Sequence, residues 1–172
     1  MEMLDVFDKF GNHVGIRSRE FCHSKNPGVF HKPTWIWIVN SKGQLLIQRR
    51  AKDVKENANK WDAPVAGHTL AGESCIDACV RETQEEIGVK VDKSEFKFVK
   101  EWINTEGWEF AQIYILMLDI SEQEMRLQEK EVSQIKWVNF SEFVDLLHSS
   151  EFVQFPEDYK EWLIKTLKQQ KV

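Results

Sequence analysis

The segment from Ser74 to Gly88 constrains the fold more than any other part of the chain. Ser74, followed by Asp77 three residues later, resembles a capping box at a helix start. Gly88 stands where a left-handed cap would end that helix. At about 100° per residue, the apolar side chains between them fall on one face, namely Ile76, Cys79, Val80, Thr83 and Ile87. We therefore predict an amphipathic helix with one side in the core.

Strand patterns lie before and after this helix. Thr34–Val39 and Leu45–Gln48 flank the turn Asn40–Gly43 and predict a hairpin. Further along, the same reasoning predicts strands at Phe96–Trp102, Phe110–Leu118 and Ile135–Val138, and helices at Ser141–Leu147 and 157–170. Strands on both sides of one central helix favour an α/β fold in which a mixed β-sheet packs between helices.

The ends and loops complete the expected organisation. The whole chain, 1–172, reads as a single domain of ordinary size. Residues 1–33 read as an N-terminal extension that opens with a hairpin over Leu4–Val14 and continues as a polar, irregular stretch from Ser18 to Pro33. Lys52–Lys60 is charged and lacks an apolar period, so we expect a surface loop.

Charge and composition exclude several classes of partner. The chain has 23 Lys and Arg against 28 Asp and Glu, a formal net charge of −5. This balance argues against nucleic-acid and anionic-membrane partners, because no excess of cations can displace counterions. No apolar run approaches the roughly 20 residues of a membrane span, and the first residues do not resemble a signal peptide. Three cysteines without a CxxC spacing favour a reducing, cytoplasmic compartment.

The predicted helix also carries an acidic face. Glu82, Glu85 and Glu86 stand at i, i+3 and i+4, where like charges repel one another. Hard divalent cations such as Mg²⁺ or Mn²⁺ bind through oxygen ligands of this kind. Arg81 can tether one carboxylate and orient it, and a strand–loop–helix arrangement would bring the Gly67 carbonyl to the same place. Such a centre suits a small-molecule diphosphate substrate.

This stretch resembles the signature of the Nudix hydrolases, G-x5-E-x7-R-E-U-x-E-E-x-G-U, where U is aliphatic. Thr83 departs mildly at the first U, and Val89 satisfies the last. Every fixed position matches: Gly67, Glu73, Arg81, Glu82, Glu85, Glu86 and Gly88.

The resemblance implies an α/β/α sandwich and hydrolysis of a nucleoside diphosphate linked to another moiety. It implies Mg²⁺ or Mn²⁺ held by Glu82, Glu85 and Glu86 together with the Gly67 carbonyl. Glu82 or a distant glutamate would be the general base, with Arg81 and Glu73 supporting the loop and helix at the catalytic centre. Glu131, six residues before Trp137, stands where a later glutamate completes the site in several members.

A second resemblance points to the isopentenyl-diphosphate isomerases, which use the same fold. Their metal histidines are matched in order by His23, His31 and His68, so the resemblance implies a second metal site there. Glu109 matches one of their glutamates. The essential cysteine, however, falls on Ala66, and the second acidic residue falls on Ala111.

Three functions therefore compete. A Mg²⁺-dependent pyrophosphohydrolase is favoured, because alkene isomerisation lacks an evident acid without the thiol. An isomerase and a catalytically silent nucleotide-binding module are the alternatives. Trp108 is our candidate for stacking on a base, and Arg49 or Arg50 for a phosphate contact. The oligomeric state stays open, a homodimer included.

Overall fold

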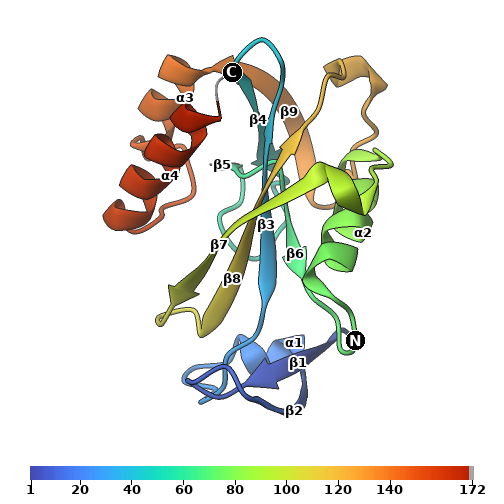
Figure 1. The fold of residues 1–172 in the computed structure, drawn as a ribbon, viewed down its shortest axis with the longest axis vertical. Helices are drawn as coiled ribbons and strands as arrows, with labels where there is room; N and C mark the ends of the chain where they lie inside the picture. Colours follow the sequence, from blue (N-terminus) through green and yellow to red (C-terminus); the bar gives the residue numbers. More distant parts are fainter. Residues whose placement is uncertain (171–172) are drawn as a thin grey trace. The chain divides into compact units, whose positions relative to one another are not determined.

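The computed structural model describes residues 1–170, which form two compact units interleaved in sequence. The first unit comprises Met1–Ile36, Ala66–Gln84 and Lys90–Ile115. The second comprises Trp37–Val65, Glu85–Val89 and the residues from Leu116 onward. Four of the described elements continue from one unit into the other, namely β3 (Pro33–Val39), β6 (Val65–His68), α2 (Cys75–Ile87) and β8 (Glu109–Met117) (Figure 1).

Helix α2 has nearly the predicted bounds. Ser74 Oγ accepts a hydrogen bond of 3.2 Å from the Asp77 backbone at its start, and Gly88 adopts φ +73° just after its end, a conformation that glycine reaches without strain. Cys79, Thr83 and Ile87 are fully buried, as expected, whereas Ile76 and Val80 are half-buried.

The first unit opens with a two-stranded antiparallel sheet formed by β1 (Met3–Phe7) and β2 (His13–Ser18), as predicted. A single helical turn, α1 (Arg19–Cys22), follows in the stretch expected to be irregular. This turn forms because the Ser18 side chain accepts from the Phe21 backbone. Buried Cys22 then joins a small apolar cluster with Leu4, Val6, Val29 and Leu70.

Strand β1 also contacts the loop that precedes α2. Leu4 and Leu70 form an isolated antiparallel bridge, the Ala71 backbone donates to the Met3 carbonyl at 2.8 Å, and the Gly72 backbone donates to Asp5 Oδ2 at 2.7 Å. The N-terminal extension is thus attached to residues 70–72. The same unit holds β7 (Phe96–Asn104), a short 3₁₀ turn at Lys93–Glu95, and the end of β6 (Val65–His68).

The second unit is built on β4 (Gln44–Arg50), which pairs antiparallel with β9 (Val132–Asn139) and with the two-residue strand β5 (Trp61–Asp62). Helices α3 (Phe140–Leu147) and α4 (Glu157–Gln169) contact each other (Figure 1). Trp37 is fully buried here, and its Nε1 donates to the Tyr159 hydroxyl at 3.0 Å. A 3₁₀ turn at Glu122–Glu124 and a loop over 52–60 complete the unit.

Strand pairing confirms the expected α/β class. Seven strands are hydrogen-bonded in one open sheet in the order β5-β4-β3-β8-β7, with β6 added to β3 and β9 to β4. Strand β5 was not predicted, because it has only two residues and its order depends on tertiary pairing: both residues pair with β4, and Trp61 also bonds the Glu151 carbonyl and the Val153 amide, 90 and 92 residues further along the chain. None of the described helices is long and apolar enough to cross a bilayer.

Candidate functional site

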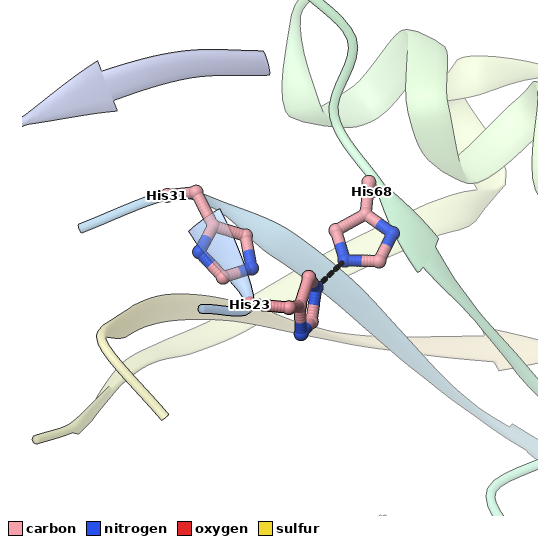
Figure 2. Close-up of side chains that lie close together, drawn as sticks. All are labelled: His23, His31 and His68. Atoms are coloured by element: carbon pink, nitrogen blue, oxygen red, sulfur yellow. Dashed lines mark hydrogen bonds between the residues drawn. The ribbon is translucent and has the colours of Figure 1, made fainter. Parts of the chain in front are cut away.

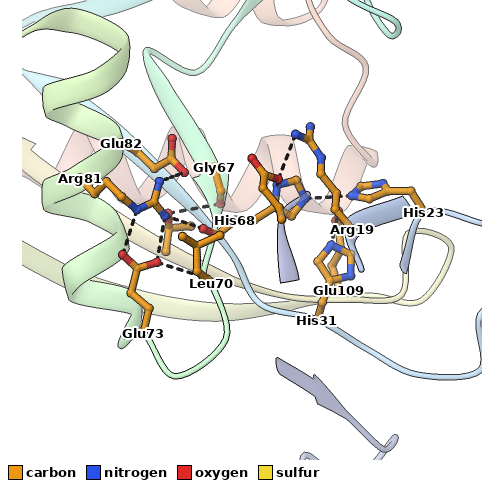
Figure 3. Close-up of polar contacts among 12 residues, drawn as sticks. Arg19, His23, His31, Gly67, His68, Leu70, Glu73, Arg81, Glu82 and Glu109 are labelled. Atoms are coloured by element: carbon orange, nitrogen blue, oxygen red, sulfur yellow. Dashed lines mark hydrogen bonds and ion pairs between the residues drawn. The ribbon is translucent and has the colours of Figure 1, made fainter. Parts of the chain in front are cut away.

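Arg81 is the centre of a polar cluster in the first unit (Figure 3). Its Nε and Nη2 donate to the two carboxylate oxygens of Glu73, each at 2.9 Å. Nη1 donates to Glu82 Oε1 at 2.6 Å, and Nη2 also donates to the His68 carbonyl at 2.8 Å. The hydrogen bond with Glu73 raises the Arg81 pKa further above its ordinary value, so the cation is permanent. The predicted tether of Arg81 to a carboxylate is confirmed.

The loop before the helix is ordered by the same carboxylate. Glu73 Oε2 accepts a hydrogen bond of 2.9 Å from the Leu70 backbone. Gly67 lies directly against Glu82, since a Cβ added at Gly67 would be 2.0 Å from Glu82 Cδ. Its carbonyl accepts from Thr34 Oγ1 at 3.4 Å. Gly67, Glu73 and Arg81 therefore together fix the position of Glu82.

The three glutamates of α2 differ in exposure. Glu85 is exposed, Glu82 is half-buried and Glu86 is only 2% exposed. Because all three belong to one continuous helix, their i, i+3, i+4 spacing places them on neighbouring positions of its surface. Burying a carboxylate is costly unless it has partners, so Glu86 is not part of a solvated acidic face. Binding of a cation by the three glutamates stays a prediction.

Glu131 lies in the second unit, on the segment that leads into β9. Its side chain is exposed. Its carbonyl accepts from the Ala51 backbone and its amide donates to the Gln128 carbonyl, both at 2.8 Å. The Gln128 amide in turn donates to the Glu86 carbonyl at 3.0 Å. The segment that carries Glu131 is thus attached to the end of α2, and its proposed catalytic role stays a prediction.

Three histidines meet in the first unit, as the second resemblance implied (Figure 2). His23 follows α1, His31 lies in the segment before β3, and His68 ends β6. Nitrogen atoms of the three rings lie within 4.8 Å of one another, and the Nε2 atoms of His23 and His68 are 2.8 Å apart. Such a set matches the ligands of borderline-soft divalent cations such as Zn²⁺.

The protonation of this cluster favours metal binding. Burial lowers the pKa of His31 to about 4 and that of His68 to about 2. Both rings are therefore neutral near pH 7 and keep a lone pair for a cation. His31 is 0% exposed, and neither of its ring nitrogens has a hydrogen-bond partner among the described residues. Its nearest carboxylate oxygen belongs to Glu109, at 3.8 Å.

Comparison with known proteins identifies the family. The family model described as NUDIX domain matches residues 29–163 of this chain. The chain belongs to the Nudix family. An uncharacterised Nudix hydrolase of Listeria monocytogenes, lmo0368, is 36% identical over 129 residues, which cover 75% of each protein.

Other relatives are more distant or much longer. Nudix hydrolase 3 of Arabidopsis thaliana is 31% identical over 91% of this chain, and the chain spans only 22% of that protein's length. Isopentenyl-diphosphate Delta-isomerase 2 of Photorhabdus laumondii is 29% identical, with 96% of this chain and 90% of that protein covered. DR0079 from Deinococcus radiodurans has a solved structure with a TM-score of 0.76 at 23% identity, over 96% of this chain and 99% of that one. This likeness confirms the Nudix α/β/α fold.

The isomerase-like features of this Nudix protein are incomplete. Ala111 is fully buried in β8, two residues after Glu109, and Glu109 accepts a hydrogen bond from Asn104 Nδ2 at 2.9 Å. Ala66 directly precedes Gly67. The histidine cluster therefore has one neighbouring carboxylate from β8, and neither alanine supplies an acid or a thiol.

The remaining candidates make structural contacts. Arg49 Nε donates to the Asn59 carbonyl, and Arg50 Nη1 contacts Asp62 Oδ2 at 3.1 Å. These bonds tie both arginines to their own unit, and a phosphate contact stays a prediction. Trp108 adopts φ +55°, unusual for a bulky residue, and packs on Phe30 with ring centroids 5.2 Å apart.

Sequence reasoning missed Gln48. Its Nε2 donates to Glu86 Oε2 at 3.1 Å in the second unit. The available signal was a polar side chain at the end of the apolar run Leu45–Ile47, since a buried amide in a strand requires a partner.

Proposed function

We propose that this protein is a Mg²⁺- or Mn²⁺-dependent hydrolase that cleaves a diphosphate linkage in a nucleoside diphosphate derivative or a similar organic pyrophosphate. The observation that carries the proposal is the bonding of Arg81, which holds Glu73, Glu82 and the His68 carbonyl at once. This arrangement fixes the loop and one carboxylate of the acidic helix before any ligand binds, as a preorganised site requires.

The residues that would hold the cation are Glu82, Glu85 and Glu86, with the Gly67 carbonyl. The set consists of oxygen atoms, which suits hard divalent cations, and the 2% exposure of Glu86 fits a charge that must be balanced. A bound Mg²⁺ would neutralise diphosphate oxygens and lower the pKa of a bound water. Glu82 is our candidate for the general base, with Glu131 as the alternative, and Arg81 keeps Glu82 in place.

A second metal site is proposed at His23, His31 and His68. The supporting observation is His31, whose two buried ring nitrogens have no hydrogen-bond partner among the residues described. Buried polar groups of this kind are rare unless a ligand satisfies them. Three imidazoles, with Glu109 near His31, suit Zn²⁺ or a similar transition-metal ion.

Isomerisation of an allylic diphosphate is the alternative reaction. The relatives that carry that name in Photorhabdus laumondii and Serratia proteamaculans cover nearly the whole chain, and the histidine cluster favours it. Ala66 and Ala111 argue against it, because a methyl group can neither donate nor accept a proton. A silent nucleotide-binding module is less favoured, since every carboxylate of the signature is present.

Incubation of the purified protein with Mg²⁺ and a panel of nucleoside diphosphate derivatives in ¹⁸O water tests the proposal. We expect ¹⁸O in one phosphate product and no turnover in excess chelator. Isopentenyl diphosphate, added separately, should give no dimethylallyl isomer. Formation of that isomer at an enzymatic rate, without cleavage of any diphosphate in the panel, would show that the isomerase alternative is right.

A cytoplasmic location stays a prediction.

A further inference from the structure

We propose that Gln48 is a positioning residue that orients Glu86 for metal binding, an inference that rests on the proposed function. The Gln48 amide donates from Nε2 to Glu86 Oε2 at 3.1 Å. Both side chains are buried, with 3% of Gln48 and 2% of Glu86 exposed. The contact is therefore shielded from water. A hydrogen bond to a carboxylate is stronger in such a buried environment than in water.

The backbones at both ends of this bond are rigidly held. Gln48 pairs with Asp62 of β5 and with Ile135 of β9, so its strand is bonded on both edges. The backbone carbonyl of Glu86 accepts a hydrogen bond of 3.0 Å from the backbone N–H of Gln128. The carbonyl of the next residue, Ile87, accepts one of 2.9 Å from the backbone N–H of Arg126. A side-chain bond between two fixed backbones leaves the Glu86 carboxylate little freedom to rotate.

The chemistry of an amide suits this task. An amide N–H fixes one carboxylate oxygen and leaves the negative charge available to a cation, whereas lysine or arginine would neutralise that charge. The cation two residues further along β4, Arg50, donates instead to Asp62 Oδ2 and to the Glu56 carbonyl. Strand β4 thus presents a neutral donor to Glu86.

The other half of the amide supports the same assignment. Gln48 Oε1 is buried and has no hydrogen-bond partner among the described residues. An unpaired buried acceptor is unfavourable, so this glutamine contributes little as a purely structural residue. Its bond to Glu86 alone determines which way the amide faces.

Titration with Mn²⁺ alone, followed by electron paramagnetic resonance, tests the inference on the full chain. Mn²⁺ could bind both at the glutamates of α2 and at the three histidines. The part of the binding that is lost in Glu86→Gln is assigned to the glutamates, and only this part is compared between variants. Gln48→Met keeps the length of the side chain and removes the donor. We expect this variant to bind that Mn²⁺ about 10- to 100-fold more weakly, as is typical when a partner of a metal ligand is lost, with an unchanged melting temperature.

Gln112→Met is the matched control. Gln112 is 8% exposed and its Nε2 donates to Glu101 Oε2 at 2.6 Å, so it is another buried amide bonded to a glutamate away from α2. We expect its Mn²⁺ affinity to equal that of the unmodified protein.

The outcomes separate the two proposals. If Glu86→Gln removes no Mn²⁺ binding, the helix is not a metal site, and the proposed function and the role of Gln48 both fail. If Glu86→Gln removes binding while Gln48→Met keeps full affinity, only the role of Gln48 fails. If the loss of Mn²⁺ binding in Gln48→Met equals the loss of folded protein, Gln48 is a structural residue and the inference fails. The same conclusion follows if Gln112→Met loses as much Mn²⁺ affinity.

Discussion

The Glu82 side chain fills the space beside Gly67 in which a side chain at position 67 would lie. A Cβ at position 67 would be 2.0 Å from Glu82 Cδ and 2.1 Å from Glu82 Oε1. The glycine of the signature is therefore required by the glutamate that stands 15 positions later. Its φ lies outside the positive range, so close approach, and not backbone freedom, explains why this position has no side chain.

Gly67→Ala should destabilise the protein by about 1–3 kcal/mol, as overpacking in a filled site does. In a Glu82→Ala background the same change should cost much less, because the clashing atoms are gone. Denaturant unfolding of the two single variants and the double variant measures this coupling. Additive losses would show that the contact does not determine the cost.

Arg81→Lys should lower both stability and turnover. Lysine keeps the charge but cannot reproduce the paired bonds to Glu73 together with those to Glu82 and the His68 carbonyl. We expect a loss of about 1–3 kcal/mol in unfolding free energy and a fall in kcat. Arg17→Lys, at an exposed position, is the control and should leave both unchanged. Equal behaviour of the two variants would contradict the central position of Arg81.

Glu85→Gln and Glu86→Gln should each reduce kcat by at least 100-fold, since losing a metal ligand removes several kcal/mol of transition-state stabilisation and about 1.4 kcal/mol corresponds to a factor of ten. Thermal stability without metal should hold or rise, because repulsion between carboxylates is relieved. Steady-state kinetics with Mg²⁺ and thermal unfolding in chelator measure the two effects. A variant that retains its kcat is not a ligand.

The stability of the metal-free protein should fall in mild acid. The pKa values of His31 and His68 are lowered on folding to about 4 and about 2 from 6.5, mainly by burial. The unfolded chain therefore binds more protons below pH 6.5, and the stability present above that pH is lost as the pH falls toward 4. We expect a loss of roughly 5–6 kcal/mol over this window, since each of the two groups contributes about 1.4 kcal/mol per pH unit; urea unfolding in chelator measures it. His31→Gln should reduce the dependence by about half, because His68 remains, and His148→Gln, at an exposed position, should leave it unchanged.

Co²⁺, a spectroscopic substitute for Zn²⁺, should bind to His23, His31 and His68 and give visible absorption bands. At 100 times its Kd it should stabilise the fold by about 2.7 kcal/mol. His68→Asn should abolish the bands, while His13→Asn, which alters a histidine bonded to Asp5, should keep them. Bands that survive in His68→Asn would place the ion elsewhere.

Local patterns predicted much of the fold. The bounds of α2 followed from Ser74 and Gly88, because capping is a property of neighbouring residues. The hairpin of β1 and β2 followed from its turn near Gly11, which adopts φ +83°. Turn α1 was missed because a single helical turn has no period to detect, and its burial depends on Cys22 meeting Leu4 and Val6.

The residues of the candidate site could be predicted from the sequence in two cases. Glu82, Glu85 and Glu86 follow from their spacing along one helix, and Gly67, Glu73 and Arg81 from the family signature. The three histidines could be listed only through resemblance, because residues 23, 31 and 68 become neighbours through tertiary pairing. Gln48 could not be assigned at all, since its partner Glu86 is 38 residues away. Contacts between strand and helix side chains depend on packing, which a sequence pattern does not encode.

The attachment of β1 to residues 70–72 has a consequence for recombination within the family. The family match begins at residue 29, yet Met3, Leu4 and Asp5 all contact the loop before Glu73, and His23 reaches His68. A chimera joined at residue 29 would separate both sets of partners. Exchange of the first 28 residues between relatives should succeed only when positions 68–72 are inherited from the same parent.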